Sequence, residues 1–197
     1  MQRTRLAWTV DGRRLEAVEP TPGEVARHAE ALALAYNDPA NATLLGHTTP
    51  LTQADVIEHY ADLDDAGAHQ FLLYVDGELA GDADLRGVRD GAAEFAFLIG
   101  KPATQGQGLG TRFARMIHAF AFAPAPVGLG LARIYVSVVP TNTASLRVFA
   151  KLGYREDRSD TARAWADEPG DVVLVVDAAA SARAQPALGD DLIIARR

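Results

Sequence analysis

The sequence of 197 residues contains no cysteine. This absence excludes disulfides, a cysteine nucleophile and metal sites built from thiolates, and it agrees with a reducing compartment. A long apolar segment is missing as well. The N-terminal residues MQRTRLAWTV lack the apolar core of a signal peptide, and no stretch approaches the roughly 18 apolar residues of a spanning helix. We therefore expect a cytoplasmic protein with no membrane partner.

Positive charge is scarce, with 19 Lys and Arg residues against 26 Asp and Glu residues and a formal net charge of -7. Nucleic acids and anionic membranes bind basic surfaces, so we expect neither as a partner, whereas a cationic ligand would be tolerated. None of the five histidines stands at close ligand spacing from another. The sequence therefore predicts no metal site.

The length, with 48% hydrophobic and 23% charged residues, is typical of a single folded domain. We assign this domain to residues 1–177. Residues 178–197 are rich in alanine and are interrupted by Pro186 and Gly189. We expect them to form a flexible tail or an arm that packs on a partner subunit, so a homodimer is one expected assembly.

Apolar periodicity predicts a succession of strands and helices. Three strands in the middle of the chain are joined by the turns Asp76-Gly77 and Asp90-Gly91, because glycine adopts positive φ without steric cost. These three strands should therefore be antiparallel. The expected strands cover residues 14–19, 70–75, 78–86, 92–99, 132–139 and 171–176, the expected helices cover 24–36, 53–64, 109–122 and 141–152, and 37–50 is expected to be a loop.

A glycine-rich turn lies between the strand over 92–99 and the helix over 109–122. Alternate glycines let the main chain approach a ligand closely, and the free amides at a helix start attract an anion such as a pyrophosphate. The turn is no Walker A loop, which ends in Gly-Lys-Ser/Thr, and Thr111 stands where a Rossmann fingerprint needs Gly or Ala. A turn with a purely structural role is the alternative.

The turn matches the pattern Q/R-x-x-G-x-G/A at Gln105, Gly108 and Gly110. This is the acetyl-CoA motif of the GNAT N-acetyltransferase superfamily. A second GNAT signature, N-x-x-S/A followed by K-x-G-F/Y, is matched by residues 142–145 and 151–154. Residues 14–177 thus resemble a GNAT domain, in particular the branch related to ribosomal-protein N-terminal acetyltransferases. The resemblance implies an α/β fold with a mixed, mostly antiparallel central sheet, flanked by helices and splayed at the acetyl-CoA cleft.

The resemblance also implies roles for single residues. The main chain around Leu98 and Ile99 would hold the pantetheine arm as an added strand would. Asn142 would contact the coenzyme or order the splayed strand ends, and a simple N-cap is the alternative role. The pyrophosphate would be held by the main-chain amides of Gln105, Gly106, Gln107, Gly108, Leu109, Gly110 and Thr111.

Glu94 is the candidate general base. It lies on the same strand face as Ala96 and Leu98, and some GNAT enzymes carry a catalytic glutamate at this spacing before the glycine motif. A carboxylate at an exposed strand end is the alternative. Phe149 stands where many members carry a tyrosine that protonates the leaving thiolate. Because phenylalanine cannot donate a proton, the usual acid group is missing.

We therefore predict an acetyl-CoA-dependent N-acetyltransferase, with acetyl-CoA as cosubstrate and no metal. It would move the acetyl group by direct transfer to a primary amine of a small molecule or a protein N-terminus. The alternative is a non-catalytic acyl-CoA-binding sensor or interaction module. Such a module would need the glycine turn but neither a competent base nor an open acceptor cleft.

Overall fold

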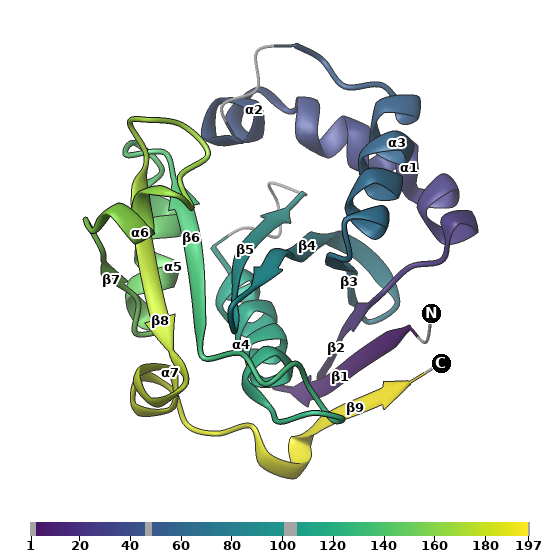
Figure 1. Cartoon of the computed structure of the whole chain (residues 1–197). Helices are drawn as coiled ribbons and strands as arrows, with labels where there is room; N and C mark the ends of the chain where they lie inside the picture. The colour runs from purple at the N-terminus through teal and green to yellow at the C-terminus, as the bar shows by residue number, and fades with distance from the viewer. Residues whose placement is uncertain (1–2, 46–48, 101–105, 197) are drawn as a thin grey trace.

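The computed structural model describes residues 3–45, 49–100 and 106–196. They form one nine-stranded sheet in the order β7-β8-β6-β5-β4-β3-β2-β1-β9 (Figure 1). Neighbouring strands are antiparallel except β5 and β6, which are parallel. The strands are β1 (Thr4–Val10), β2 (Arg13–Val18), β3 (His69–Val75), β4 (Glu78–Arg89), β5 (Ala92–Ile99), β6 (Arg133–Val138), β7 (Arg155–Glu156), β8 (Val172–Asp177) and β9 (Leu192–Arg196).

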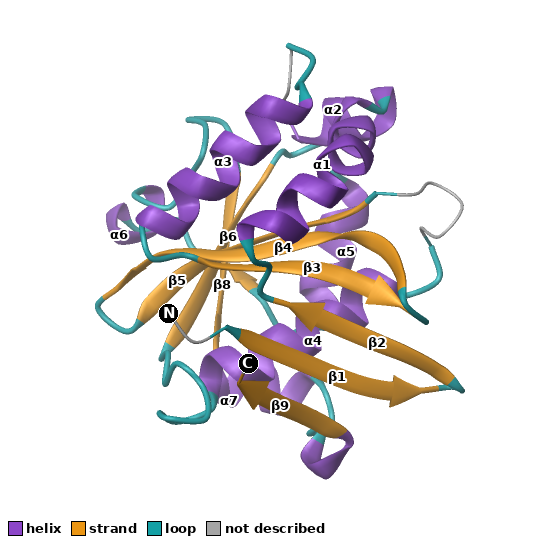
Figure 2. Cartoon of the chain, turned by 90° about the vertical axis from the view of Figure 1, so that its right-hand side faces the viewer, coloured by secondary structure: helices purple, strands orange, loops and turns teal. Residues whose placement is uncertain are grey.

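Helices cover both faces of the sheet. Figure 2 shows α1, α2 and α3 above the sheet, with α4, α5 and α7 below it. This layered arrangement is the mixed α/β fold that the resemblance implies. The helices are α1 (Pro22–Asn37), α2 (Pro39–Leu45), α3 (Gln53–Asp65), α4 (Leu109–Phe122), α5 (Thr143–Lys151), α6 (Asp160–Arg163) and α7 (Ala178–Ala184).

The main core lies between the sheet and α4. Residues on one face of α4, including Phe113, Met116, Ile117 and Phe120, are fully buried, because their helical spacing turns them together toward the sheet. A smaller core joins α1 and α3 to β3, with Leu32 and Val56 among its members. The apolar faces of both helix layers are buried against the sheet, which is therefore held between them.

The N-terminal hairpin differs from the sequence prediction, which began the sheet at residue 14. β1 pairs with β2 through the turn Asp11-Gly12, whose φ values of 53° and 72° are those of a tight hairpin turn. The expected loop over 37–50 contains α2 among its described residues. The helices predicted over 24–36 and 53–64 correspond to α1 and α3.

The last residues also differ from expectation. Instead of forming only a free tail or an arm for a partner, they build α7 and then β9, which pairs with β1 of the same chain. The first and the last strand of the chain, β1 and β9, consequently lie side by side (Figure 1). Within the described residues, no helix is both long and apolar enough to cross a membrane.

Candidate active site

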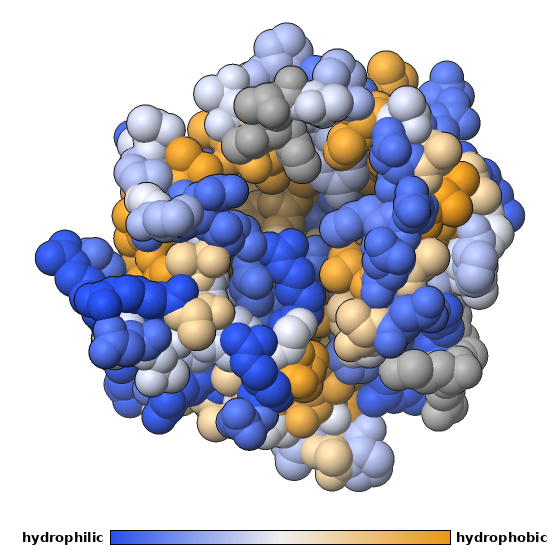
Figure 3. All heavy atoms as spheres, turned by 45° about the horizontal axis from the view of Figure 1, so that its top comes forward, coloured by the Kyte–Doolittle hydropathy of each residue, from blue (hydrophilic) through white to orange (hydrophobic). Residues whose placement is uncertain are grey.

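The sheet opens between β5 and β6. These parallel strands pair only where Ala92, Ala93 and Glu94 face residues 133–135. Beyond Glu94 the two strands separate, as the resemblance implies. A cleft of about 570 Å³ opens in the gap, and Figure 3 shows this hollow with hydrophilic residues at its rim. Its walls come from β4, β5, the end of β6, the ends of α1 and α2, the first half of α3, α5, and the loop before β8.

Along this gap, the main-chain N–H and C=O groups of successive β5 residues point alternately toward β4 and toward the splay. The Gly100 amide donates to the Ala80 carbonyl of β4 over 2.8 Å, and Leu98 pairs with Asp82 in the same ladder. Because main-chain groups alternate in an antiparallel pair, those of Leu98 point toward β4. Those of Phe97 and Ile99 point the other way, toward the splay, and an extended ligand there would meet the groups of Phe97.

The glycine turn stands at the open end of the splay. Gly108 is the N-cap of α4 with φ 77°, and Gly106 has φ 76°. A Cβ atom built on either glycine would meet no heavy atom of the described residues within 4 Å. The first amides of α4, from Leu109 to Thr111, have no partner from a preceding helical turn. This end of the helix therefore presents main-chain donors that suit an anion.

Other members of the predicted turn have additional roles. The Leu109 side chain is buried in the core, so only its main chain is available to a ligand. The Gln107 side chain accepts a hydrogen bond of 3.3 Å from Arg13 at the N-terminal hairpin. A Cβ on Gly110 would lie 2.8 Å from the Phe97 ring, so close packing requires glycine there. Gln105 lies outside the described residues.

Asn142 is the N-cap of α5. Its side-chain oxygen accepts a hydrogen bond of 3.0 Å from the Ser145 amide. Asn142 also lines the cleft. The structure thus shows the capping role, whereas the coenzyme contact stays a prediction.

A row of charged side chains on β4 forms one wall of the cleft. Asp82, Asp84 and Arg86 alternate along the strand and share one face of the sheet. In the antiparallel register they lie opposite Leu98, Ala96 and Glu94, in that order. Sequence reasoning did not single out these three residues, although the alternation in Asp-Ala-Asp-Leu-Arg indicates a strand with one polar face.

Arg86 holds Glu94. Its Nε and Nη2 atoms donate to the two Glu94 carboxylate oxygens over 3.1 and 2.6 Å. Nη2 also lies 3.1 Å from Asp167. Burial raises the pKa of Glu94, and the hydrogen bonds and charge of Arg86 oppose that rise. Glu94 therefore belongs to an ion-pair cluster at the closed end of the splay, where the positive charge of Arg86 balances the negative charge of the carboxylate.

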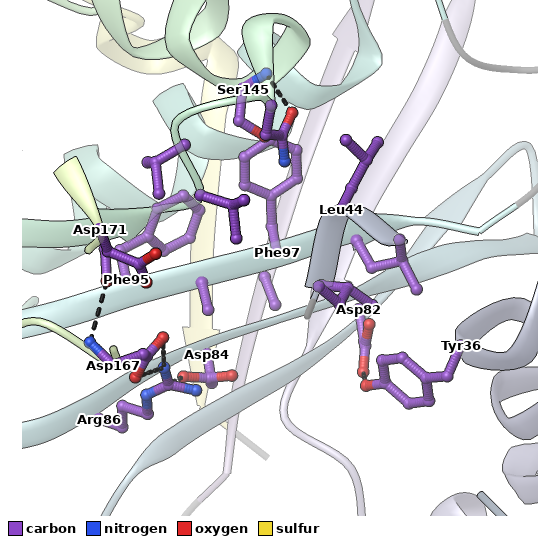
Figure 4. A pocket seen from close by; sticks show the side chains of 18 of the residues that line it. Tyr36, Leu44, Asp82, Asp84, Arg86, Phe95, Phe97, Ser145, Asp167 and Asp171 are labelled. Carbon is purple, nitrogen blue, oxygen red and sulfur yellow. Dashed lines mark hydrogen bonds and ion pairs between the residues drawn. The ribbon is translucent and has the colours of Figure 1, made fainter. Parts of the chain in front are cut away.

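Asp82 is a buried carboxylate with tyrosine partners. It is 6% exposed, and the hydroxyl groups of Tyr36 on α1 and Tyr60 on α3 both donate to its Oδ2 atom. Burial raises the pKa of Asp82 to about 6, although these hydrogen bonds lower it. Asp82 thus ties the upper helices to the sheet beside the cleft, as Figure 4 shows for Tyr36.

Asp84 is a partly buried carboxylate with weaker pairing than Asp82. Its side chain is 15% exposed, and its Oδ1 atom lies 4.0 Å from Arg86 Nε. Oδ1 is buried and has no hydrogen-bond partner among the described residues. Burial raises the pKa of Asp84 to about 7, despite the opposing charge of Arg86. Figure 4 shows Asp84 beside Arg86 and Asp167 on one side of the cleft.

Aromatic rings form the opposite wall. Phe149 is 4% exposed and contacts Phe95 and Phe97 edge-on, with ring centroids 6.4 and 5.8 Å apart. The Tyr154 hydroxyl is hydrogen-bonded to His118 over 3.0 Å in the core, so Tyr154 is a packing residue that does not replace the missing acid. Among the described side chains, no group of three or more His, Asp or Glu residues could hold a metal ion.

Comparison with known proteins identifies the domain. The profile of the acetyltransferase (GNAT) domain family matches residues 21–155, which is more than half of the chain. A comparison with curated proteins gave no match.

Solved structures share the fold. RimJ from Mycobacterium smegmatis, in complex with CoA-disulfide, superposes with a TM-score of 0.70 at 18% identity, covering 93% of this chain and 95% of RimJ. The aminoglycoside acetyltransferase AAC(6')-Ib, in complex with coenzyme A, gives 0.66 at 19% identity and covers 91% and 98%. The ribosomal-protein-S5-alanine acetyltransferase from Vibrio fischeri gives 0.65 at 13% identity and covers 87% and 96%.

Proposed function

The chain belongs to the GNAT acetyltransferase family, and from this premise we propose that it transfers the acetyl group of acetyl-CoA to a primary amine. The observation that carries this proposal is the splay between β5 and β6, with the open start of α4 at its end and an acidic cleft beside it. Structural neighbours that share this fold were solved with coenzyme A or CoA-disulfide bound.

The coenzyme would bind along the splay. Its pyrophosphate would meet the amides from Gly106 to Thr111, where the two open glycines leave room for close approach. Its pantetheine arm would pair with main-chain groups of Phe97, which point toward the gap. One of the amides there could donate to the oxyanion of the tetrahedral intermediate. Asn142 would border the same channel from α5.

The acceptor would occupy the acidic cleft. Six carboxylate residues line it, whereas Arg86 is the single Lys or Arg residue in the described lining. An amine with a pKa near ~10.4 is protonated at neutral pH, so this lining favours a cationic acceptor. The carboxylates are Asp55, Asp82, Asp84, Asp167, Glu168 and Asp171.

The acceptor amine must lose a proton before it attacks the thioester. A positioned general base accelerates such a step by about 10²–10⁴. Glu94 remains the base predicted from the sequence, and its pairing with Arg86 gives some support to the rival, a non-catalytic acyl-CoA-binding module. The open cleft and the weakly paired Asp84 favour the enzyme.

Release of coenzyme A tests the proposal. The purified protein would be mixed with acetyl-CoA and three amine probes: an alanine-initiated peptide, spermidine and kanamycin. We expect thiol release and an acetylated product with at least one probe. Acetyl-CoA binding without transfer to any of the probes would instead support the non-catalytic module.

A further inference from the structure

The register of β4 places a second carboxylate at the point where the cleft opens. We propose that Asp84 is the group that removes the proton from the acceptor amine. This inference rests on the proposed function and names a residue for its central step.

The first support is position. The last paired residue of β5 on the β6 side is Glu94, opposite Tyr135. Asp84 lies opposite Ala96, two residues further toward the open end. It is therefore nearer than Glu94 to Leu98 and Ile99, where the thioester end of the pantetheine would lie. Asp84 lines the cleft together with Ala96, whereas Glu94 does not belong to the described lining.

The second support is the hydrogen bonding of the three carboxylates on this sheet face. Glu94 accepts two hydrogen bonds from Arg86. Asp82 accepts from two tyrosine hydroxyl groups. Asp84 has the buried Oδ1 atom with no described hydrogen-bond partner, with Arg86 Nε at 4.0 Å. Of these three, Asp84 is the carboxylate that accepts no hydrogen bond from a described side chain, and its side chain, which is 15% exposed, lines the cleft.

The third support is the basicity of the group. Burial raises the pKa of Asp84 to about 7, which narrows the gap to an amine of pKa ~10.4. Proton transfer to such a group is unfavourable by roughly 10³, against roughly 10⁶ for an aspartate of ordinary pKa ~3.9. The charged or titratable groups around Asp84 are Asp82 and Arg86 on β4, Glu94 on β5, Tyr36 on α1, Asp55 and His59 on α3, and Asp167, Glu168 and Asp171 before β8.

The step balances as follows. The ammonium group gives one proton to the Asp84 carboxylate, and the neutral nitrogen attacks the carbonyl carbon of the thioester. A C–N bond forms while the carbonyl electron pair moves to oxygen. The electron pair on oxygen then re-forms the carbonyl as the C–S bond breaks, sulfur leaves with the bonding pair, and a second proton from nitrogen goes to sulfur to give the thiol and the neutral amide. Asp84 finally releases its proton to solvent.

Two variants separate the candidate bases. Asp84→Asn and Glu94→Gln each replace a carboxylate by an amide of the same size. Asp65→Asn, at an exposed position at the end of α3, is the matched control for the substitution itself. Each variant would be assayed with the best of the three amine probes from pH 5 to 9. Circular dichroism and calorimetric titration with acetyl-CoA would verify folding and coenzyme binding.

We expect Asp84→Asn to bind acetyl-CoA like wild type and to lose about 10²–10⁴ of kcat. The fall of wild-type kcat/KM below pH about 7 should disappear in this variant, because the group with that pKa is gone. Glu94→Gln should lose less activity and keep that fall.

Two results would overturn the inference. If Asp84→Asn stays within tenfold of wild type and keeps the acid limb while Glu94→Gln loses it, then Glu94 is the base. If wild type binds acetyl-CoA but acetylates none of the three probes, the proposed function itself fails and the role of Asp84 falls with it.

Discussion

Replacing Asp84 by asparagine should stabilise the folded protein at alkaline pH. The Asp84 side chain is 15% exposed, and burial raises its pKa to about 7 from a model-compound value of 3.8. The folded state therefore binds the Asp84 proton more tightly than the unfolded state does. The stabilising contribution of this proton is present below pH 3.8 and is lost as pH rises toward 7.

The size of this effect follows from the shift in pKa. A rise from 3.8 to about 7 corresponds to about 4 kcal/mol, since one pKa unit is worth ~1.36 kcal/mol. About 2.5 kcal/mol of this loss falls between pH 5 and pH 8. Asparagine does not titrate. The free energy of unfolding of Asp84→Asn, relative to wild type, should therefore increase by about 2.5 kcal/mol over that range.

Urea denaturation at pH 5, 6, 7 and 8 would measure the difference. With an m-value of about 2 kcal/mol per molar urea, the gap between the two midpoints should widen by about 1 M. Comparing the two proteins at each pH removes any constant effect of the amide group. The exposed control Asp65→Asn should show no such trend.

A gap that stays constant from pH 5 to pH 8 would refute this reasoning, because Asp84 would then titrate as it does in an unfolded chain. A gap that narrows with rising pH would mean that the folded protein stabilises the Asp84 carboxylate. Either result would also remove the elevated pKa from the argument that Asp84 is the base.

Three further substitutions test the structure around the cleft by urea denaturation. In Gly81→Ala the new Cβ would lie 1.8 Å from the Leu98 carbonyl oxygen, so we expect a loss of about 3 kcal/mol, and a loss below 0.5 kcal/mol would contradict the register of β4 and β5. Thr21→Ala removes the acceptor of the Glu24 amide in the capping box of α1 and should lower the free energy of unfolding by about 1 kcal/mol. Thr21→Ser keeps a hydroxyl acceptor and should retain most of that stability. Arg86→Met removes the cation that lowers the pKa of its carboxylate neighbours and should cost about 3 kcal/mol at pH 8; the loss should be smaller at pH 5, and equal losses would argue against the ion-pair cluster.

The central part of the fold could be predicted because local signals determine both ends of its elements. β5 runs from the turn Asp90-Gly91 to the glycine turn, and α4 begins behind Gly108 and ends before Pro124, so both have the predicted bounds. The turn Asp11-Gly12 offers the same hairpin signal, yet β1 was not predicted. β9 could not be, because its pairing with β1 joins residues from opposite ends of the chain.

The candidate site also has a part that the sequence predicts and a part that it does not. The glycine turn and Asn142 were found because their spacing along the chain carries the signal. The importance of Asp84 and Arg86 arises from cross-strand register and from burial beneath α1 and α3. Both depend on contacts between distant segments, so no local sequence pattern indicates them. Glu94 lies on the predicted strand face opposite Arg86, but its ion pair became visible only in the folded structure. Whether Glu94 acts as the base stays a prediction.

Calorimetric titration of acetyl-CoA tests the central claim most directly. Gly108→Glu would place a negative side chain at the open start of α4, whereas Gly67→Glu makes the same change at a distant glycine with a matching φ of 76° and equally open surroundings. The account predicts that wild type and Gly67→Glu bind acetyl-CoA and that Gly108→Glu loses at least tenfold in affinity. Equal binding by all three folded proteins would contradict the coenzyme site at this turn, and no binding by wild type would contradict the proposed function.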